Sequence, residues 1–294
     1  MILNFLSLPL FYRIIIALCF SFLFFFIGGE RFVKWLKKKK MVDHFRDYSP
    51  PTHLSKKGTP SGGGIFILLS AGICWFLFAD FSSKYLLIVI LSTFLFGLAG
   101  LVDDLVKKKN KNSKGLSIRL KLSLQVIFTF LIFLFFFLSN FHFKSDIKLP
   151  FTGYTIESGF FYTAVFFIFI LGFANAVNLT DGLDGLVAGC MIAPSIFFAV
   201  ISLIQSNAYL ASLFKMPHLP EMKELSVFWV ALLGSIGGFL RYNRYPARMF
   251  MGGVGAEALG AACGISALVL KVEAFFLIAG GIFLAEAVSV VTQV

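Results

Sequence analysis

Acidic and amide side chains gather at the ends of apolar segments in this chain. Residues 175–185 read Asn-Ala-Val-Asn-Leu-Thr-Asp-Gly-Leu-Asp-Gly, and Asp103 and Asp104 end another apolar run. Ionisable residues beside lipid are costly, so they mark functional sites by default. Mg²⁺ prefers carboxylate oxygens, usually one or two, with phosphates and water completing its shell. The pattern therefore predicts a metal-dependent site at a membrane surface.

Each of these motifs also has a simpler interpretation. Asp103 and Asp104 could cap helices or pair with the lysines at 107–109, although the combined set of acids favours a site. The glycine-rich stretch 58–64, after Lys56 and Lys57, favours a backbone that wraps an anion. Close helix packing is the preferred explanation of the glycines at 62–64. His53 could contact phosphate or a lipid headgroup, or simply lie at the interface.

The elements that must position these residues are apolar. The chain has 294 residues, 58% of them hydrophobic, and a mean hydropathy of +0.88, which excludes a soluble globule. Apolar runs recur along the chain, and their length is close to the roughly 20 residues that a helix needs to cross a bilayer. They lack the period-two alternation that is typical of strands. The sequence predicts an all-α polytopic membrane protein with about nine transmembrane helices. These are expected at 10–29, 62–79, 85–102, 117–138, 160–178, 185–204, 226–241, 255–270 and 273–294.

The net charge of +11 does not indicate nucleic-acid binding, because the cations sort by loop. Of 26 Lys and Arg residues, 19 fall in 31–57, 107–121 and 241–248. These segments share one side if the N-terminus lies outside, as the positive-inside rule requires. All four motif-bearing loops are then cytoplasmic. The outside loop 139–158 contains a turn sequence that favours a small hairpin, and the four cysteines show no metal-ligand spacing.

Taken together, the motifs resemble the phospho-N-acetylmuramoyl-pentapeptide transferase family. The similar stretches cover nearly the whole chain: 53–64, 100–125, 175–189, 239–260 and 286–293. The resemblance implies transfer of phospho-N-acetylmuramoyl-pentapeptide from its uridine diphosphate carrier, UDP-MurNAc-pentapeptide, to undecaprenyl phosphate. The products are lipid I and UMP, in peptidoglycan biosynthesis at the bacterial inner membrane, with Mg²⁺ as cofactor. A homodimer is one alternative for the assembly, which the sequence leaves open.

The resemblance also implies roles for individual residues. Asp103, Asp104 and Asp181 match the family's catalytic and metal-binding acids. The positions that match its substrate contacts are His53, Lys56, Asn175, Asn178, Leu183, Asp184 and Phe250.

Two departures from the family pattern predict weak turnover. The family's Phe-Met-Gly-Asp motif ends in a metal-binding aspartate, but here that position is Gly253, and Glu257 lies about one helical turn further on, poorly placed to replace it. The chain is expected to be a single integral membrane transferase domain, 1–294, that lacks the family's histidine-rich loop and tenth helix.

Two other functions remain alternatives. A polyprenyl-phosphate N-acetylglucosamine-1-phosphate transferase would use the same fold and metal chemistry on a different sugar. A non-catalytic membrane protein could retain the fold and bind uridine ligands without releasing UMP. A transporter fits less well, because carriers usually bind their substrates near the midplane of the membrane.

Overall fold

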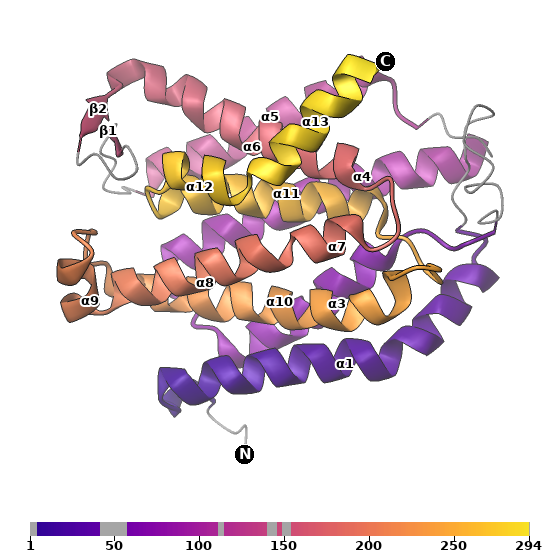
Figure 1. Cartoon of the computed structure of the whole chain (residues 1–294), viewed down its shortest axis with the longest axis horizontal. Coiled ribbons are helices and arrows are strands. Elements are labelled where there is room, and N and C mark those ends of the chain that lie inside the picture. Colours follow the sequence, from indigo (N-terminus) through magenta and orange to yellow (C-terminus); the bar gives the residue numbers. More distant parts are fainter. Residues whose placement is uncertain (1–4, 42–57, 111–114, 140–145, 149–153, 294) are drawn as a thin grey trace.

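The protein is a bundle of helices with one short sheet (Figure 1). The structure is a computed structural model that describes residues 5–41, 58–110, 115–139, 146–148 and 154–293. Its α-helices are α1 (Leu10–Lys38), α3 (Gly63–Phe78), α4 (Lys84–Asn110), α5 (Ile118–Leu138), α6 (Tyr162–Thr180), α7 (Leu186–Cys190), α8 (Ile192–Ser206), α9 (Ala208–Leu213), α10 (Lys223–Asn243), α11 (Gly252–Val269), α12 (Glu273–Ala279) and α13 (Gly281–Gln293). The 3₁₀ helices are η1 (Phe5–Ser7), η2 (Gly159–Phe161) and η3 (Pro220–Met222), and the strands are β1 (Asp146–Lys148) and β2 (Thr155–Glu157).

The prediction of an all-α polytopic membrane protein is confirmed. Within the described ranges, seven helical segments are long and apolar enough to cross a membrane, and the bent pair α12–α13 makes an eighth. The one remaining expected span, at 62–79, corresponds to α3, which has only 16 residues, or about 24 Å of helix.

Three of the expected spans are present but differ in detail from one straight helix of the expected length. The first helix continues beyond residue 29 to Lys38, because no proline interrupts the charged turns that follow the apolar run. The span expected at 185–204 is divided into α7 and α8 just before Pro194, which cannot donate a helical hydrogen bond. The span expected at 273–294 bends by 68° at the Gly280–Gly281 pair, since glycine weakens a helix interior.

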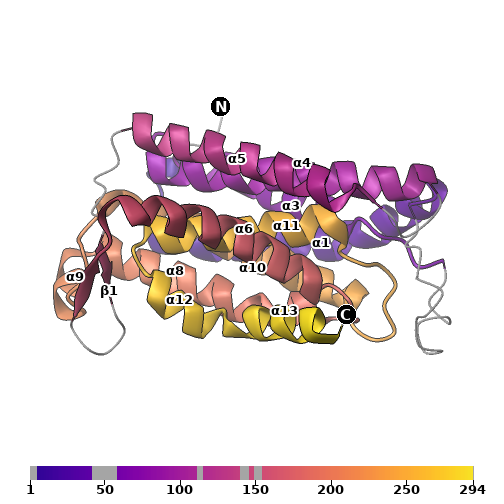
Figure 2. The same cartoon turned by 90° about the horizontal axis from the view of Figure 1, so that it is seen from above.

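Helix α11 forms the centre of the bundle. It packs between α4 and α6 and also against α3, while α10 packs against α1, α3 and α8 (Figure 2). All residues of α11 from Gly253 to Val269 are buried. Gly64 allows the contact with α3, because a Cβ atom there would lie 2.2 Å from the Cα of Gly255. The packing interpretation of this glycine is therefore confirmed.

The bundle has two chemically different ends. We call the end where α4, α6 and α10 finish and α11 begins the site end, and the opposite end the hairpin end (Figure 1). At the hairpin end β1 and β2 pair antiparallel, with Ile147 opposite Ile156. The hairpin predicted within 139–158 is thereby confirmed in its strand pairing.

Candidate active site at the site end of the bundle

Two acidic residues from different motifs meet at the first turn of α11. The Asp104 carboxylate accepts hydrogen bonds from the backbone N–H groups of Gly253 (3.2 Å) and Val254 (3.3 Å). Asp181, which follows the last residue of α6, accepts one from Gly252 (3.0 Å). The first N–H groups of a helix lack intrahelical partners and carry partial positive charge. The start of α11 therefore brings Asp104 and Asp181 together and stabilises their negative charges.

Gly252 makes this convergence sterically feasible. Its φ of +78° lies in the left-handed region that favours glycine. A Cβ atom there would also lie 2.9 Å from both Asp104 Oδ2 and Ser61 Oγ. A larger residue would push the Asp104 carboxylate away from the helix start.

Asp103, unlike Asp104, has a lysine side chain as a close partner. It is buried, accepts a hydrogen bond from the Leu116 N–H (2.7 Å) and forms an ion pair with Lys107 Nζ (2.7 Å). The same ammonium lies 3.7 Å from Asp104 Oδ1. The simpler interpretation from the sequence, pairing with a nearby lysine, is thus realised at Asp103, where it also ties the start of α5 to α4.

Asn243 joins the loop after α6 to the segment before α11. Its Oδ1 accepts from the Gly185 N–H (3.0 Å), and its Nδ2 donates to the Met249 carbonyl (3.0 Å). Asp184 makes a parallel connection by accepting from the Ala247 N–H (3.0 Å). Asn243 was not predicted as a site residue. The sequence feature that could have indicated this role is an amide at the end of an apolar run. An amide side chain both donates and accepts hydrogen bonds, so it can join two backbone segments.

Phe250 lies where the glycine-rich entry to α3 meets the start of α11. Its N–H donates to the Pro60 carbonyl (2.8 Å), and its carbonyl accepts from Gly62 (3.2 Å) and Gly63 (2.9 Å). Its side chain is partly exposed. The nearby predicted residues His53 and Lys56 lie outside the described residues.

A buried polar network connects α5, α6 and α11 one layer deeper. Asn175 donates to Gln125 (2.8 Å), and Gln125 donates to the Glu257 carboxylate (2.9 Å). Lys121 Nζ lies 2.7 Å from the other oxygen of that carboxylate. The Glu257 side chain therefore points toward α5 and away from the start of α11, where Asp104 is bound. Glu257 accordingly does not take the place of the carboxylate that the family has at position 253. The structural role of Glu257 was not predicted, although an acid within an apolar helix indicates one.

The remaining predicted contacts lie on the surface beside these acids. Asn178 is partly exposed on α6, and the Leu183 side chain is 55% exposed in the loop before α7. Among the residues that the structure describes, no three His, Cys, Asp or Glu side chains are grouped so that they alone could hold a metal ion. A two-carboxylate donor set from Asp104 and Asp181 nevertheless fits Mg²⁺, which takes its other ligands from phosphates and water.

Comparison with known proteins identifies the family. Residues 86–271 match the model of glycosyl transferase family 4, so the apolar bundle is that of a membrane transferase. The chain is 41% identical over 286 residues to phospho-N-acetylmuramoyl-pentapeptide-transferase of Thermodesulfovibrio yellowstonii, covering 96% of this chain and 79% of that protein. The same-named protein of Desulfotalea psychrophila is 38% identical, with 95% and 77% covered. This chain therefore belongs to glycosyl transferase family 4 and, within it, to the phospho-N-acetylmuramoyl-pentapeptide transferases.

Proposed function

We propose that this protein transfers phospho-N-acetylmuramoyl-pentapeptide from UDP-MurNAc-pentapeptide to undecaprenyl phosphate, giving lipid I and UMP. The observation that carries the proposal is the meeting of Asp104 and Asp181 at the start of α11, at one end of an apolar bundle. A polyprenyl phosphate stays in the bilayer, whereas a charged nucleotide sugar arrives from water. Their reaction therefore requires a site at the membrane boundary, where the site end would lie.

We assign Mg²⁺ to Asp104 and Asp181, together with the phosphates of the substrate. When bound, the ion would neutralise the diphosphate and stabilise charge on the leaving UMP. The N–H groups at the start of α11 would hold both carboxylates in place. Asp103 would position Lys107, whose ammonium lies between the two adjacent acids, as a point charge for phosphate.

We propose that the nucleotide binds beside the acids, against Leu183 and Phe250, with Asp184 holding the segment before α11 in place. Arg244 and Arg248 are exposed in that segment and would attract a polyphosphate. Asn178 is a proposed direct contact, as are His53 and Lys56 by resemblance. Asn175 would act through its hydrogen bond to Gln125.

We propose that turnover is reduced because Gly253 stands where the family has a third carboxylate. The chain is also proposed to form one integral membrane domain with its N-terminus outside and the site end in the cytoplasm of a bacterium. The sorting of 19 of 26 cations to that side supports this orientation at the inner membrane. Assembly as a homodimer remains a proposal.

The decisive experiment is UMP release by the purified protein with undecaprenyl phosphate and Mg²⁺. UDP-MurNAc-pentapeptide and UDP-N-acetylglucosamine should be supplied separately and in competition. The proposal predicts release from the first donor, inhibition by EDTA, and a further increase in the Gly253→Asp variant. Release only from the second donor would identify the other sugar transferase. Uridine binding without release by either the native chain or Gly253→Asp would identify a non-catalytic protein.

A further inference from the structure

A buried ion pair lies below the candidate active site. Lys121 Nζ on α5 and Glu257 Oε1 on α11 are 2.7 Å apart, and their side chains are 16% and 0% exposed. Glu257 comes four residues after Gly253, about 6 Å along α11, and the Gly253 N–H donates to Asp104. The pair therefore lies about one helical turn deeper in the bundle than an N–H group that binds Asp104.

Helix α5 begins against the other acid of the pair at 103–104. The Leu116 N–H donates to Asp103 (2.7 Å), and the Ser117 side chain caps the helix. Lys121 is the fourth residue of α5. Since the Cα–Cβ bonds of a helix tilt toward its N-terminus, the Lys121 side chain leaves α5 toward the site end. Lys121 is thus one turn nearer the acids than Gln125, which binds the other oxygen of Glu257.

The two partners of the ion pair differ in how firmly they are held. Gln125 donates to Glu257 Oε2 (2.9 Å) and accepts from Asn175 (2.8 Å), so residues of α5 and α6 fix the carboxylate. Within the described part of the chain, the Lys121 ammonium pairs with Glu257 alone, although it has three N–H groups. A lysine charge sits on a flexible four-carbon stem. The pair therefore opens by movement of the lysine while the acid stays in place.

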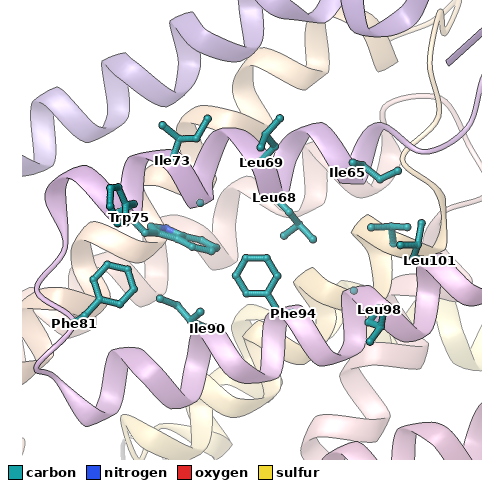
Figure 3. Close-up of a pocket in the computed structure, with 14 residues that line it drawn as sticks. Ile65, Leu68, Leu69, Ile73, Trp75, Phe81, Ile90, Phe94, Leu98 and Leu101 are labelled. Atoms are coloured by element: carbon teal, nitrogen blue, oxygen red, sulfur yellow. The ribbon is translucent and has the colours of Figure 1, made fainter. Parts of the chain in front are cut away.

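The α3 side of α11 carries no charge at this depth. Val254 faces a cavity of about 650 Å³ between α3 and α4, and all 14 residues that line it are apolar or glycine (Figure 3). Leu101 lines the same cavity two residues before Asp103. The cation one turn below the acids therefore lies on the α5 side of α11, at Lys121.

We propose that Glu257 is a positioning residue that neutralises Lys121 and so weakens the binding of a substrate phosphate at the acids. To use the full lysine charge, the phosphate must draw it away from Glu257 Oε1, which has no hydrogen-bond donor among the described residues. Separating a buried pair leaves an uncompensated charge, which is costly. The inference rests on the proposed function, whose lipid acceptor and nucleotide donor both carry phosphate.

Glu257→Gln tests this assignment, because it removes the charge and keeps the size of the side chain. At saturating Mg²⁺, the variant should lower the KM for the substrate whose phosphate Lys121 binds by about 3–10-fold. KM values for undecaprenyl phosphate and for UDP-MurNAc-pentapeptide, measured separately, identify that substrate. A merely structural role would reduce stability and lower neither KM, and that result would overturn the proposal.

Glu273→Gln is the matched control. Glu273 is also a buried acid paired with a lysine, Lys271 (3.3 Å), but it lies at the hairpin end. Both variants lose a buried charge and should lose stability, whereas Glu273→Gln should leave both KM values within about twofold, because its charge is far from the acids. Equal falls in KM in the two variants would also reject the assignment.

A double-variant comparison assigns the effect to the lysine. Lys121→Met leaves no ammonium to release, so adding Glu257→Gln to it should change neither KM, in contrast to its effect on the native chain. If Glu257→Gln lowers the KM equally with and without Lys121, Glu257 does not act through this lysine and the proposal fails.

Ligand binding separates this proposal from the proposed function. Absence of UMP release from every donor, in the native chain and in Gly253→Asp, would reject the proposed function. Equilibrium binding of uridine diphosphate and of geranyl phosphate then tests the role of Glu257 without turnover. Glu257→Gln should tighten the binding of at least one of these two ligands, and unchanged or weaker binding of both would overturn the inference.

Discussion

Carboxylates at the two ends of the bundle differ in the groups that donate hydrogen bonds to them. At the hairpin end, Glu224 receives two hydrogen bonds from Arg13 (2.5 and 3.1 Å), and Glu273 pairs with Lys271 (3.3 Å). At the site end, Asp104, Asp181 and Asp184 accept hydrogen bonds from backbone N–H groups of the segment 247–254, and Lys107 Nζ lies 3.7 Å from Asp104.

This difference separates structural charges from charges that can bind a ligand. A side-chain cation neutralises a buried carboxylate and locks the pair, as between Arg13 and Glu224, where Arg13 also donates to the Phe78 carbonyl (2.8 Å). Backbone N–H groups stabilise a carboxylate through partial charges and leave its net charge in place. The N–H groups at the start of α11 add no unit charge beside Asp104 and Asp181, whereas the Arg13 guanidinium neutralises Glu224.

The largest effect on stability is expected from breaking the Arg13–Glu224 ion pair at the hairpin end. Arg13→Met would leave Glu224 buried without its counter-charge and should lower the free energy of unfolding by about 3–5 kcal/mol. Denaturant unfolding in detergent measures this change. The double variant Arg13→Met/Glu224→Leu should recover most of the loss. If Arg13→Met lowers the free energy of unfolding by less than about 1 kcal/mol, the ion pair does not stabilise the fold as described.

At the site end the main effect should fall on catalysis. Asp181→Asn should lower kcat for UMP release by about 10²–10³-fold, because the start of α11 loses a charged partner and the metal a ligand. The melting temperature should change little. The exposed residue Glu157 at the hairpin end provides the control, and Glu157→Gln should retain full activity. Equal rates for both variants would remove Asp181 from the site.

Glu257 tests an intermediate case, a buried ion pair one layer below the site. Glu257→Leu removes the acceptor of both Lys121 and Gln125 and should lower the free energy of unfolding by about 1–3 kcal/mol. Thermal unfolding with and without Mg²⁺ should give the same loss, since this acid is assigned no metal. A loss seen only with Mg²⁺ would place Glu257 in the metal site.

The smallest effect is expected at Gly253. A Cβ atom there would lie 3.1 Å from Asp104 Oδ1, so Gly253→Asp adds a second carboxylate beside the first. Without metal it should destabilise the protein by about 1 kcal/mol, and Mg²⁺ should reverse the loss and raise turnover. Gly253→Asn, which lacks the charge, should show no such response. Identical Mg²⁺ responses of the two variants would show that this position does not face the ion.

The apolar pattern predicted the helices well, but it could not predict how they end or which neighbours they meet. Hydropathy does not distinguish one straight span from α7 and α8, or from α12 and α13, because a break depends on local residues such as Pro194 and on packing. The acids were recognisable because charge is rare in this chain. Their partners were not, since backbone donors such as the Gly252 N–H leave no side-chain signal.

The claim that acids at the site end bind the metal, whereas acids at the hairpin end are structural, is tested most directly by metal binding. Mn²⁺ serves as a paramagnetic substitute for Mg²⁺. Electron paramagnetic resonance of the purified protein with a uridine diphosphate ligand should show one bound ion. Asp104→Asn and Asp181→Asn should each weaken that binding at least tenfold, and Glu273→Gln at the hairpin end should not. Unchanged Mn²⁺ affinity in both aspartate variants would contradict a metal site at the start of α11.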